Sequence, residues 1–196
     1  MRQETHATDG SVLTWKPPEG YQLHYLNGTA SIAGVGILIR HSFLANFDTP
    51  LSLQLDDIVP GRIGRLRLHG SEGDLDLYTV YLTTGDAKVE RAAQRRALAK
   101  ALAPPERALS IIGGDWNCTP EELAATGWLQ LVNGVVKSPR AATCNGRVLD
   151  VFVVAASFSH AVLSVHTLGD TGCNPHAGAR TALIAPPPLL RCRRTA

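Results

Sequence analysis

The sequence has 196 residues, of which 44% are hydrophobic and 18% are charged, and its formal net charge is +2. This length fits one domain with a substantial core and is too short for two ordinary domains. The near-neutral balance excludes strong long-range attraction to nucleic acids or other polyanions. Any phosphate must therefore be bound by a local site.

Cysteine usage and the N-terminus bear on where the protein works. The four cysteines show no C-x-x-C pair and no Cys/His zinc spacing, which argues against a disulfide framework and a structural metal. The first residues, "MRQETHATDG", lack the basic segment and apolar run of a secretory signal, and no stretch approaches the roughly 18 apolar residues of a membrane span. We expect an intracellular protein, nuclear or cytoplasmic, that does not contact membranes; no obligate protein partner is evident.

The first half of the chain alternates β-branched and aromatic runs with turn signals, which predicts consecutive strands. These strands are expected at residues 21–26, 34–40, 51–55, 64–68 and 75–82. Asn27-Gly28 and Glu72-Gly73-Asp74 contain residues that tolerate positive φ, so each predicts a hairpin. The first half is therefore expected to be mostly antiparallel sheet.

An Ala-rich, basic stretch at residues 86–102 has its apolar side chains at helical spacing, which predicts an amphipathic helix. Asp86 is the expected N-cap, and Pro104-Pro105 would end the helix. The helix carries three arginines that could form a phosphate-binding face, although a solvated face is the commoner fate of such charges. These arginines are Arg91, Arg95 and Arg96.

The second half is expected to contain strands at residues 108–113, 148–155, 160–168 and 180–185. A short helix should begin at Pro120, with Thr119 as N-cap and Glu122 completing a capping box. We predict one mixed α/β domain over residues 1–185, followed by a Pro-rich and basic tail over residues 186–196.

Asp115 and Asn117 follow the strand at 108–113 and two glycines. In an extended segment their side chains would project to the same side and form an oxygen-rich corner, with Trp116 pointing the opposite way into the core. An Asx-type turn before the helix explains the same two residues equally well.

Glu4, Asp150 and His176 each place an ionisable group at the edge or in the interior of an apolar segment. A carboxylate such as Asp150 is costly to bury unless it is paired or holds a cation. Together with Asp115, these carboxylates favour one converging site. The remaining histidines show no paired ligand spacing, so structural or surface roles are expected for His6, His24, His41, His69, His160 and His166.

Five segments occur in an order that identifies a family. They are "QETH" at residues 3–6, "LYTVYL" at 77–82, "IIGGDWN" at 111–117, "RVLDVFVV" at 147–154 and "PH" at 175–176. With these segments the sequence resembles the endonuclease/exonuclease/phosphatase superfamily, and most of all apurinic/apyrimidinic endonucleases and the endonuclease domains of non-LTR retroelements. The resemblance extends from Gln3 to about Ile184.

The resemblance implies an α/β (α+β) fold, a four-layer αββα sandwich of two mixed β-sheets, with the active site at one end. It implies phosphodiester hydrolysis that depends on a divalent metal, Mg²⁺ or Mn²⁺, with DNA as the partner and an endonuclease of the retroelement type as the function. Two alternatives stay open: a phosphomonoesterase or phosphoinositide phosphatase, and a catalytically impaired remnant of the fold.

Site roles follow from the same resemblance. Glu4 would ligate the metal, Asp115 would orient or deprotonate the attacking water, and Asn117 would position the phosphate or that water. Tyr81 would contact the phosphate or stabilise charge. Asp150 would support the site or the histidine. His176 would donate to the phosphate oxygens.

The sequence departs from the family pattern at two places. Family members carry a strand–helix unit before the "QETH" segment, so we expect this chain to be truncated at its N-terminus, without the first strand–helix unit of the fold. They also have an aspartate directly before the histidine, where this chain has Asn174-Pro175. Asp170 is the residue that could orient His176 instead.

Overall fold

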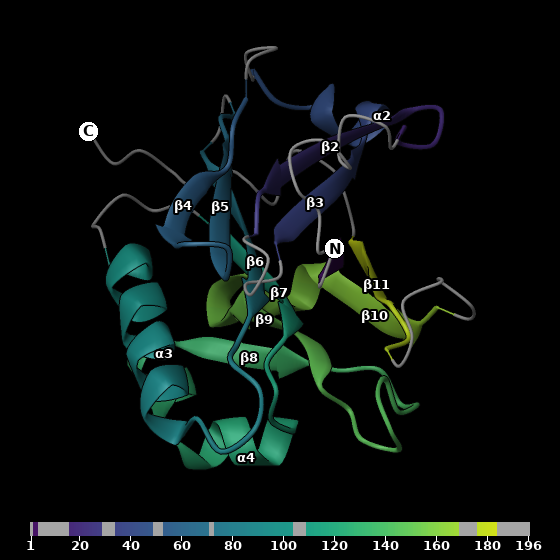
Figure 1. Cartoon of the computed structure of the whole chain (residues 1–196). Coiled ribbons are helices and arrows are strands. Elements are labelled where there is room, and N and C mark those ends of the chain that lie inside the picture. The colour runs from purple at the N-terminus through teal and green to yellow at the C-terminus, as the bar shows by residue number, and fades with distance from the viewer. Residues whose placement is uncertain are drawn as a thin grey trace.

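The computed structural model describes residues 2–3, 16–28, 34–48, 53–70, 73–103, 109–168 and 176–183. Its centre is a six-stranded sheet with the strand order β4-β5-β6-β7-β9-β8 (Figure 1). The neighbours are antiparallel except β6 and β7, which are parallel, so the sheet is mixed, as predicted. The strands are β4 (Asp56–Val59), β5 (Ile63–Leu68), β6 (Leu75–Tyr81), β7 (Leu109–Asp115), β8 (Gly134–Lys137) and β9 (Asp150–Ala155).

Two smaller antiparallel sheets accompany the large one. The first has the order β1-β3-β2, and the second pairs β10 with β11. Their strands are β1 (Arg2–Gln3), β2 (Tyr21–Leu26), β3 (Val35–Arg40), β10 (Val162–Thr167) and β11 (Ala179–Leu183). The pairing of β2 with β3 and of β5 with β6 confirms both predicted hairpins.

The described helices are few and short apart from α3 (Lys88–Leu102). This helix connects β6 to β7, as a crossover between parallel strands requires. The others are α2 (His41–Leu44), α4 (Pro120–Ala125), α5 (Trp128–Leu131) and the 3₁₀ helix η1 (Ala156–Ala161). None of the described helices combines the length and the apolar character needed to cross a bilayer.

The two faces of the large sheet are buried against different partners because side chains alternate along each strand. One face packs on α3, α4 and α5 through a cluster that includes Tyr78, Ile112 and Trp128. The other face, with Leu77 and Ile111, packs on the small sheets. In Figure 1, α3 and α4 lie on one side of the large sheet, and β2, β3, β10 and β11 lie on the other. The mixed α/β sandwich fold is therefore confirmed.

Several predicted local features are present. Thr119 caps α4: its hydroxyl accepts a hydrogen bond from the Glu122 backbone N–H (3.3 Å), and the Glu122 carboxylate accepts one from the Thr119 backbone N–H (2.8 Å). Trp116 is fully buried in the helix-covered core, as alternation predicts. Helix α3 ends at Leu102, directly before the predicted proline stop.

Two predictions of local structure are wrong. Residues 53–55 of the expected strand at 51–55 are not in a strand, which begins only at Asp56. The Leu53 carbonyl accepts a hydrogen bond from His24 Nδ1 (2.9 Å), so this apolar segment is tied to β2. Asp86 is not the N-cap of α3, because the helix starts after Ala87 and no side chain caps it.

Candidate active site

Three polar side chains lie in one row at the end of the large sheet. Tyr81 is the last residue of β6 and pairs with Asp115, the last residue of β7. Asp115 in turn pairs with Asp150, the first residue of β9. Directly paired residues point to the same face of a sheet, so all three project from the face that packs on the small sheets. Three neighbouring strand ends thereby bring residues that are far apart in the sequence into contact distance.

The backbone reverses immediately after β7. Asp115 Oδ1 accepts a hydrogen bond from the Asn117 backbone N–H (2.8 Å), and Asp115 Oδ2 accepts one from Asn117 Nδ2 (3.1 Å). Asn117 has a φ of 48°, in the left-handed region that asparagine tolerates better than most residues. The Asx-type turn therefore forms the oxygen-rich corner expected from the sequence. The two side chains meet because the backbone turns, and not because side chains alternate in an extended strand.

A third hydrogen bond of Asn117 fixes this corner to the neighbouring strand. Asn117 Nδ2 donates to the Leu82 carbonyl at 2.6 Å, one residue beyond Tyr81. Gly114 has a φ of 146°, a backbone conformation that a side chain would strain. The glycine therefore permits the bend that directs Asp115 toward its neighbours.

His176 completes the cluster from a distant part of the chain. Its Nδ1–H donates to Asp150 Oδ2 at 2.9 Å, and its Nε2 lies 3.7 Å from Asp115 Oδ2. Asp115 is 1% exposed and Asp150 is 8% exposed, whereas His176 is partly exposed. The imidazole is held between two buried carboxylates and has one side toward solvent.

Thr143, which no sequence pattern singled out, anchors both halves of this cluster. Its buried hydroxyl accepts hydrogen bonds from the backbone N–H groups of Leu149 (2.9 Å) and Asp150 (3.0 Å). Its carbonyl accepts a hydrogen bond from the Ala177 N–H (2.7 Å), and the next residue, Cys144, forms a β-bridge with His176. One threonine therefore sets the position of both Asp150 and His176.

Arg62 is a second residue that sequence reasoning missed. Its guanidinium carbon lies 4.6 Å from the centroid of the Tyr81 ring, within the range of a cation–π contact. The Arg62 carbonyl also accepts a hydrogen bond from the Tyr81 N–H (2.8 Å). The turn at Pro60-Gly61 was a signal that the next side chain would lie at a sheet end. A fixed positive charge thus lies against Tyr81.

Cys118 and the arginines of α3 differ in what they contact. Burial raises the pKa of the Cys118 thiol to about 11, against the opposing effect of Arg95, so this thiol is protonated at neutral pH. Arg91 Nη1 donates to the carbonyls of Thr83 (3.0 Å) and Gly85 (2.6 Å). This arginine therefore fixes the loop after β6, while Arg96 is exposed.

The described residues contain a group that could hold a metal ion. Ligand atoms of Asp115, Asp150 and His176 all lie within 4.8 Å of one another. Carboxylate oxygens are the ligands that Mg²⁺ and Mn²⁺ prefer, so the two aspartates fit either ion. The sequence predicted two further members of the site, Glu4 and Asp170, and both lie outside the described residues.

Residues 1–182 match the Endonuclease/Exonuclease/phosphatase family. The chain belongs to this family. Its members are hydrolases of phosphoester bonds that use divalent metals. The family resemblance drawn from the five sequence segments is thereby confirmed. None of the curated protein sequences compared with the chain matches it.

Solved structures share the fold at low sequence identity. An AP endonuclease, LMAP from Leishmania major, is 15% identical with a TM-score of 0.68 over 94% of this chain and 77% of that one. The endonuclease domain of TRAS1, a telomere-specific non-LTR retrotransposon, is 12% identical with a TM-score of 0.60 over 82% and 77%. The 3′ phosphatase NExo from Neisseria, bound to product DNA hairpin, is 15% identical with a TM-score of 0.60 over 92% and 86%.

Proposed function

We propose that the protein is a divalent-metal-dependent phosphodiesterase that cleaves DNA, an endonuclease of the retroelement type. The observation that carries this proposal is the convergence of Asp115, Asp150 and His176 at one sheet end. Membership of the family supplies the reaction class. The likeness to an AP endonuclease and to a retrotransposon endonuclease domain supports DNA as the substrate.

The Asp150–His176 pair has the geometry of an oriented proton donor. Because His176 Nδ1–H is bonded to Asp150, the other ring nitrogen, Nε2, is the one directed toward Asp115. A histidine held in this way can donate a proton or hydrogen bond to a phosphate oxygen. General acid or base catalysis by one positioned group contributes about 10²–10⁴-fold to a rate.

Asp115 is the group that orients the attacking water. Both of its oxygens accept hydrogen bonds from Asn117, so the carboxylate cannot rotate freely. A fixed acceptor holds a water molecule in the direction required for attack on phosphorus. Asn117 and Tyr81 then line the phosphate, and the Arg62 charge stacked on Tyr81 favours the anion.

A divalent cation completes this chemistry. Asp115 and Asp150 would hold it from the described part of the chain, together with Glu4 by resemblance. When bound, the ion neutralises charge that develops on the phosphate oxygens. The low net charge of the protein, +2, leaves this local charge as the main attraction for a phosphate.

A phosphomonoester is the second candidate substrate. The likeness to a 3′ phosphatase supports it, and the same cluster could act on a terminal phosphate. A phosphodiester differs from a monoester in having a second esterified oxygen, so the two substrates are easily distinguished by experiment.

The test is a panel of four substrates in the presence of Mg²⁺. We expect cleavage of a DNA duplex with an abasic site or of intact plasmid DNA, and little phosphate release from p-nitrophenyl phosphate or from a 3′-phosphorylated oligonucleotide. His176→Ala should reduce DNA cleavage by about 10²–10⁴-fold. Rapid phosphate release with DNA left intact would favour the monoesterase, and no activity on any substrate would favour the impaired remnant.

A further inference from the structure

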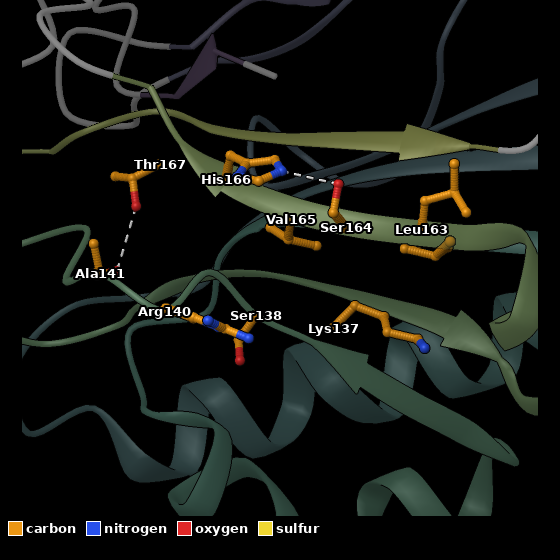
Figure 2. A pocket seen from close by; sticks show the side chains of 10 residues that line it. Lys137, Ser138, Arg140, Ala141, Leu163, Ser164, Val165, His166 and Thr167 are labelled. Atoms are coloured by element: carbon orange, nitrogen blue, oxygen red, sulfur yellow. Dashed lines mark hydrogen bonds between the residues drawn. The ribbon is translucent and has the colours of Figure 1, made fainter.

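A pocket of about 780 Å³ lies between the edges of two sheets. One wall is β10, and the other is the segment that continues from the last residue of β8, Lys137, to Ala141 (Figure 2). β10 pairs with β11 along its other edge. The pocket therefore separates the outer strand of the large sheet from the outer strand of a small one.

The charge in this pocket has one sign. Its charged side chains are Lys137 and Arg140, both on the wall that continues from β8, as Figure 2 shows. None of the ten described residues that line the pocket is acidic. For a protein whose net charge is only +2, this is a local positive surface suited to an anion.

The remaining lining suits a polymer with polar and apolar parts. Ser138 and Ser164 contribute hydroxyl groups, which donate to phosphate oxygens in nucleic-acid complexes. Leu163, 62% exposed, offers apolar contact. None of the ten lining residues is Phe, Tyr or Trp, so the pocket lacks the large rings on which bases stack and would contact the backbone without reading the sequence.

One end of the pocket adjoins the catalytic cluster. Thr167 pairs with Ala179 in the β10–β11 ladder, and the Leu168 N–H donates to the Gly178 carbonyl at 2.6 Å. Gly178 follows His176 by two residues. On the other wall, Ala141 accepts a hydrogen bond from the Thr167 hydroxyl (3.5 Å) and precedes Thr143 by two residues.

We propose that this pocket is a track for the sugar–phosphate backbone of a DNA strand that continues from the active site, with Lys137 and Arg140 each contacting a phosphate. DNA as the polyanion rests on the proposed function. A strand of a duplex and a free single strand present the same backbone chemistry. Their salt dependence separates them, because each phosphate contact contributes about 0.9 to the slope of log K against log salt for duplex DNA and about 0.7 for a single strand.

The test measures DNA binding without cleavage. Fluorescence anisotropy with a labelled duplex and a labelled single strand is recorded in EDTA over a range of salt concentrations. The variant is Lys137→Gln combined with Arg140→Gln. The control removes the same charge from the exposed face of α3, by Arg96→Gln combined with Lys100→Gln. Circular dichroism checks that both variants are folded.

The track predicts several-fold weaker binding by the pocket variant and a salt slope reduced by about 1.8 for a duplex or about 1.4 for a single strand. The control should match the wild type. The proposal would be overturned if both variants lost DNA affinity equally or if the pocket variant bound DNA as tightly as the wild type. It would also be overturned if the wild type did not bind DNA. The binding assay needs no turnover. If the pocket variant loses binding but the wild type does not nick DNA, the proposed enzymatic function is refuted and the proposed backbone track is supported.

Discussion

The side chain of His176 works through the carboxylate that holds it. Asp150 is almost fully buried and accepts the His176 Nδ1–H at 2.9 Å. In Asp150→Asn the acceptor loses its charge, so the imidazolium is no longer stabilised. We expect kcat for DNA cleavage to fall by about 10²–10⁴-fold, with the thermal unfolding midpoint shifted by only a few degrees.

A matched control for this prediction is an exposed His–Asp pair. His69 Nδ1 lies 3.1 Å from Asp74 Oδ1 on the surface, and His69→Gln should leave the cleavage rate unchanged. The double variant Asp150→Asn with His176→Ala should be no slower than His176→Ala alone, because residues that act as a unit are not additive. Multiplied losses would show that the two side chains act independently.

The sequence pointed to those site residues that stand at strand ends in recognisable segments. Asp115 and Asn117 flank a tryptophan after two glycines, and Asp150 stands out as a carboxylate in an apolar run. Thr143 carried no such signal, and Arg62 had only the preceding Pro60-Gly61 turn. A threonine in a loop has many possible partners, and only the folded loop reveals that its hydroxyl holds two backbone N–H groups.

At the scale of elements, the loop between β8 and β9 depends on Thr143. Replacing it with valine keeps the shape but removes the only acceptor that the structure gives to the Leu149 and Asp150 N–H groups in the described part of the chain. A buried N–H group without a hydrogen-bond acceptor costs about 1–3 kcal/mol. We expect Thr143→Val to lower the free energy of unfolding in urea by this amount and to reduce cleavage.

Thr143→Ser keeps the hydroxyl and separates the hydrogen bond from the packing of the methyl group. Its free energy of unfolding should remain within about 1 kcal/mol of the wild type. If serine and valine destabilise the protein equally, the hydroxyl does not anchor the loop.

Tyr78 links β6 to the end of α3 and makes this packing sensitive to alkaline pH. Its hydroxyl donates to the Ala101 carbonyl at 3.2 Å, and burial raises its pKa from 10.0 to about 12. The fold thus favours the neutral phenol. The contribution of Tyr78 to the free energy of unfolding is complete below pH 10, where the phenol is also neutral in the unfolded state. It is lost as pH rises toward about 12.

Urea unfolding at several pH values between 9 and 12 checks this direction. The free energy of unfolding of the wild type should decrease over the upper part of this range, and Tyr78→Phe should decrease less steeply. Identical slopes for the two proteins would mean that the Tyr78 phenol is not protected by the fold.

Elements with strong local patterns were predictable, and those decided by tertiary contacts were not. The capping box of α4 appears as expected because Thr119 and Glu122 need only each other. β8 was missed because a strand of four residues is too short for its alternating pattern to be recognised. In the described part of the strand expected at 51–55, Leu53 and Leu55 pack against the core, and the ladder begins at the more polar Asp56.

For the molecule as a whole, the sheet order creates the site. The strand order within the sheet places β7 between β6 and β9. Along the chain, a long helix separates β6 from β7 and two short helices separate β7 from β9. No local pattern predicts this order. The resemblance to a known family implied two mixed sheets with the active site at one end, but no strand order. The register of Tyr81, Asp115 and Asp150 explains why the three residues meet.

Hydrolysis of a phosphodiester by the cluster of Asp115, Asp150 and His176 can be measured directly. The most direct measurement is nicking of supercoiled plasmid DNA by the wild type and by Asp115→Asn, each in Mg²⁺ and in EDTA. The replacement is nearly isosteric, so the folded state should persist. We predict nicking by the wild type only in Mg²⁺, and a loss of about 10²-fold or more in Asp115→Asn. Undiminished nicking by folded Asp115→Asn would contradict the account.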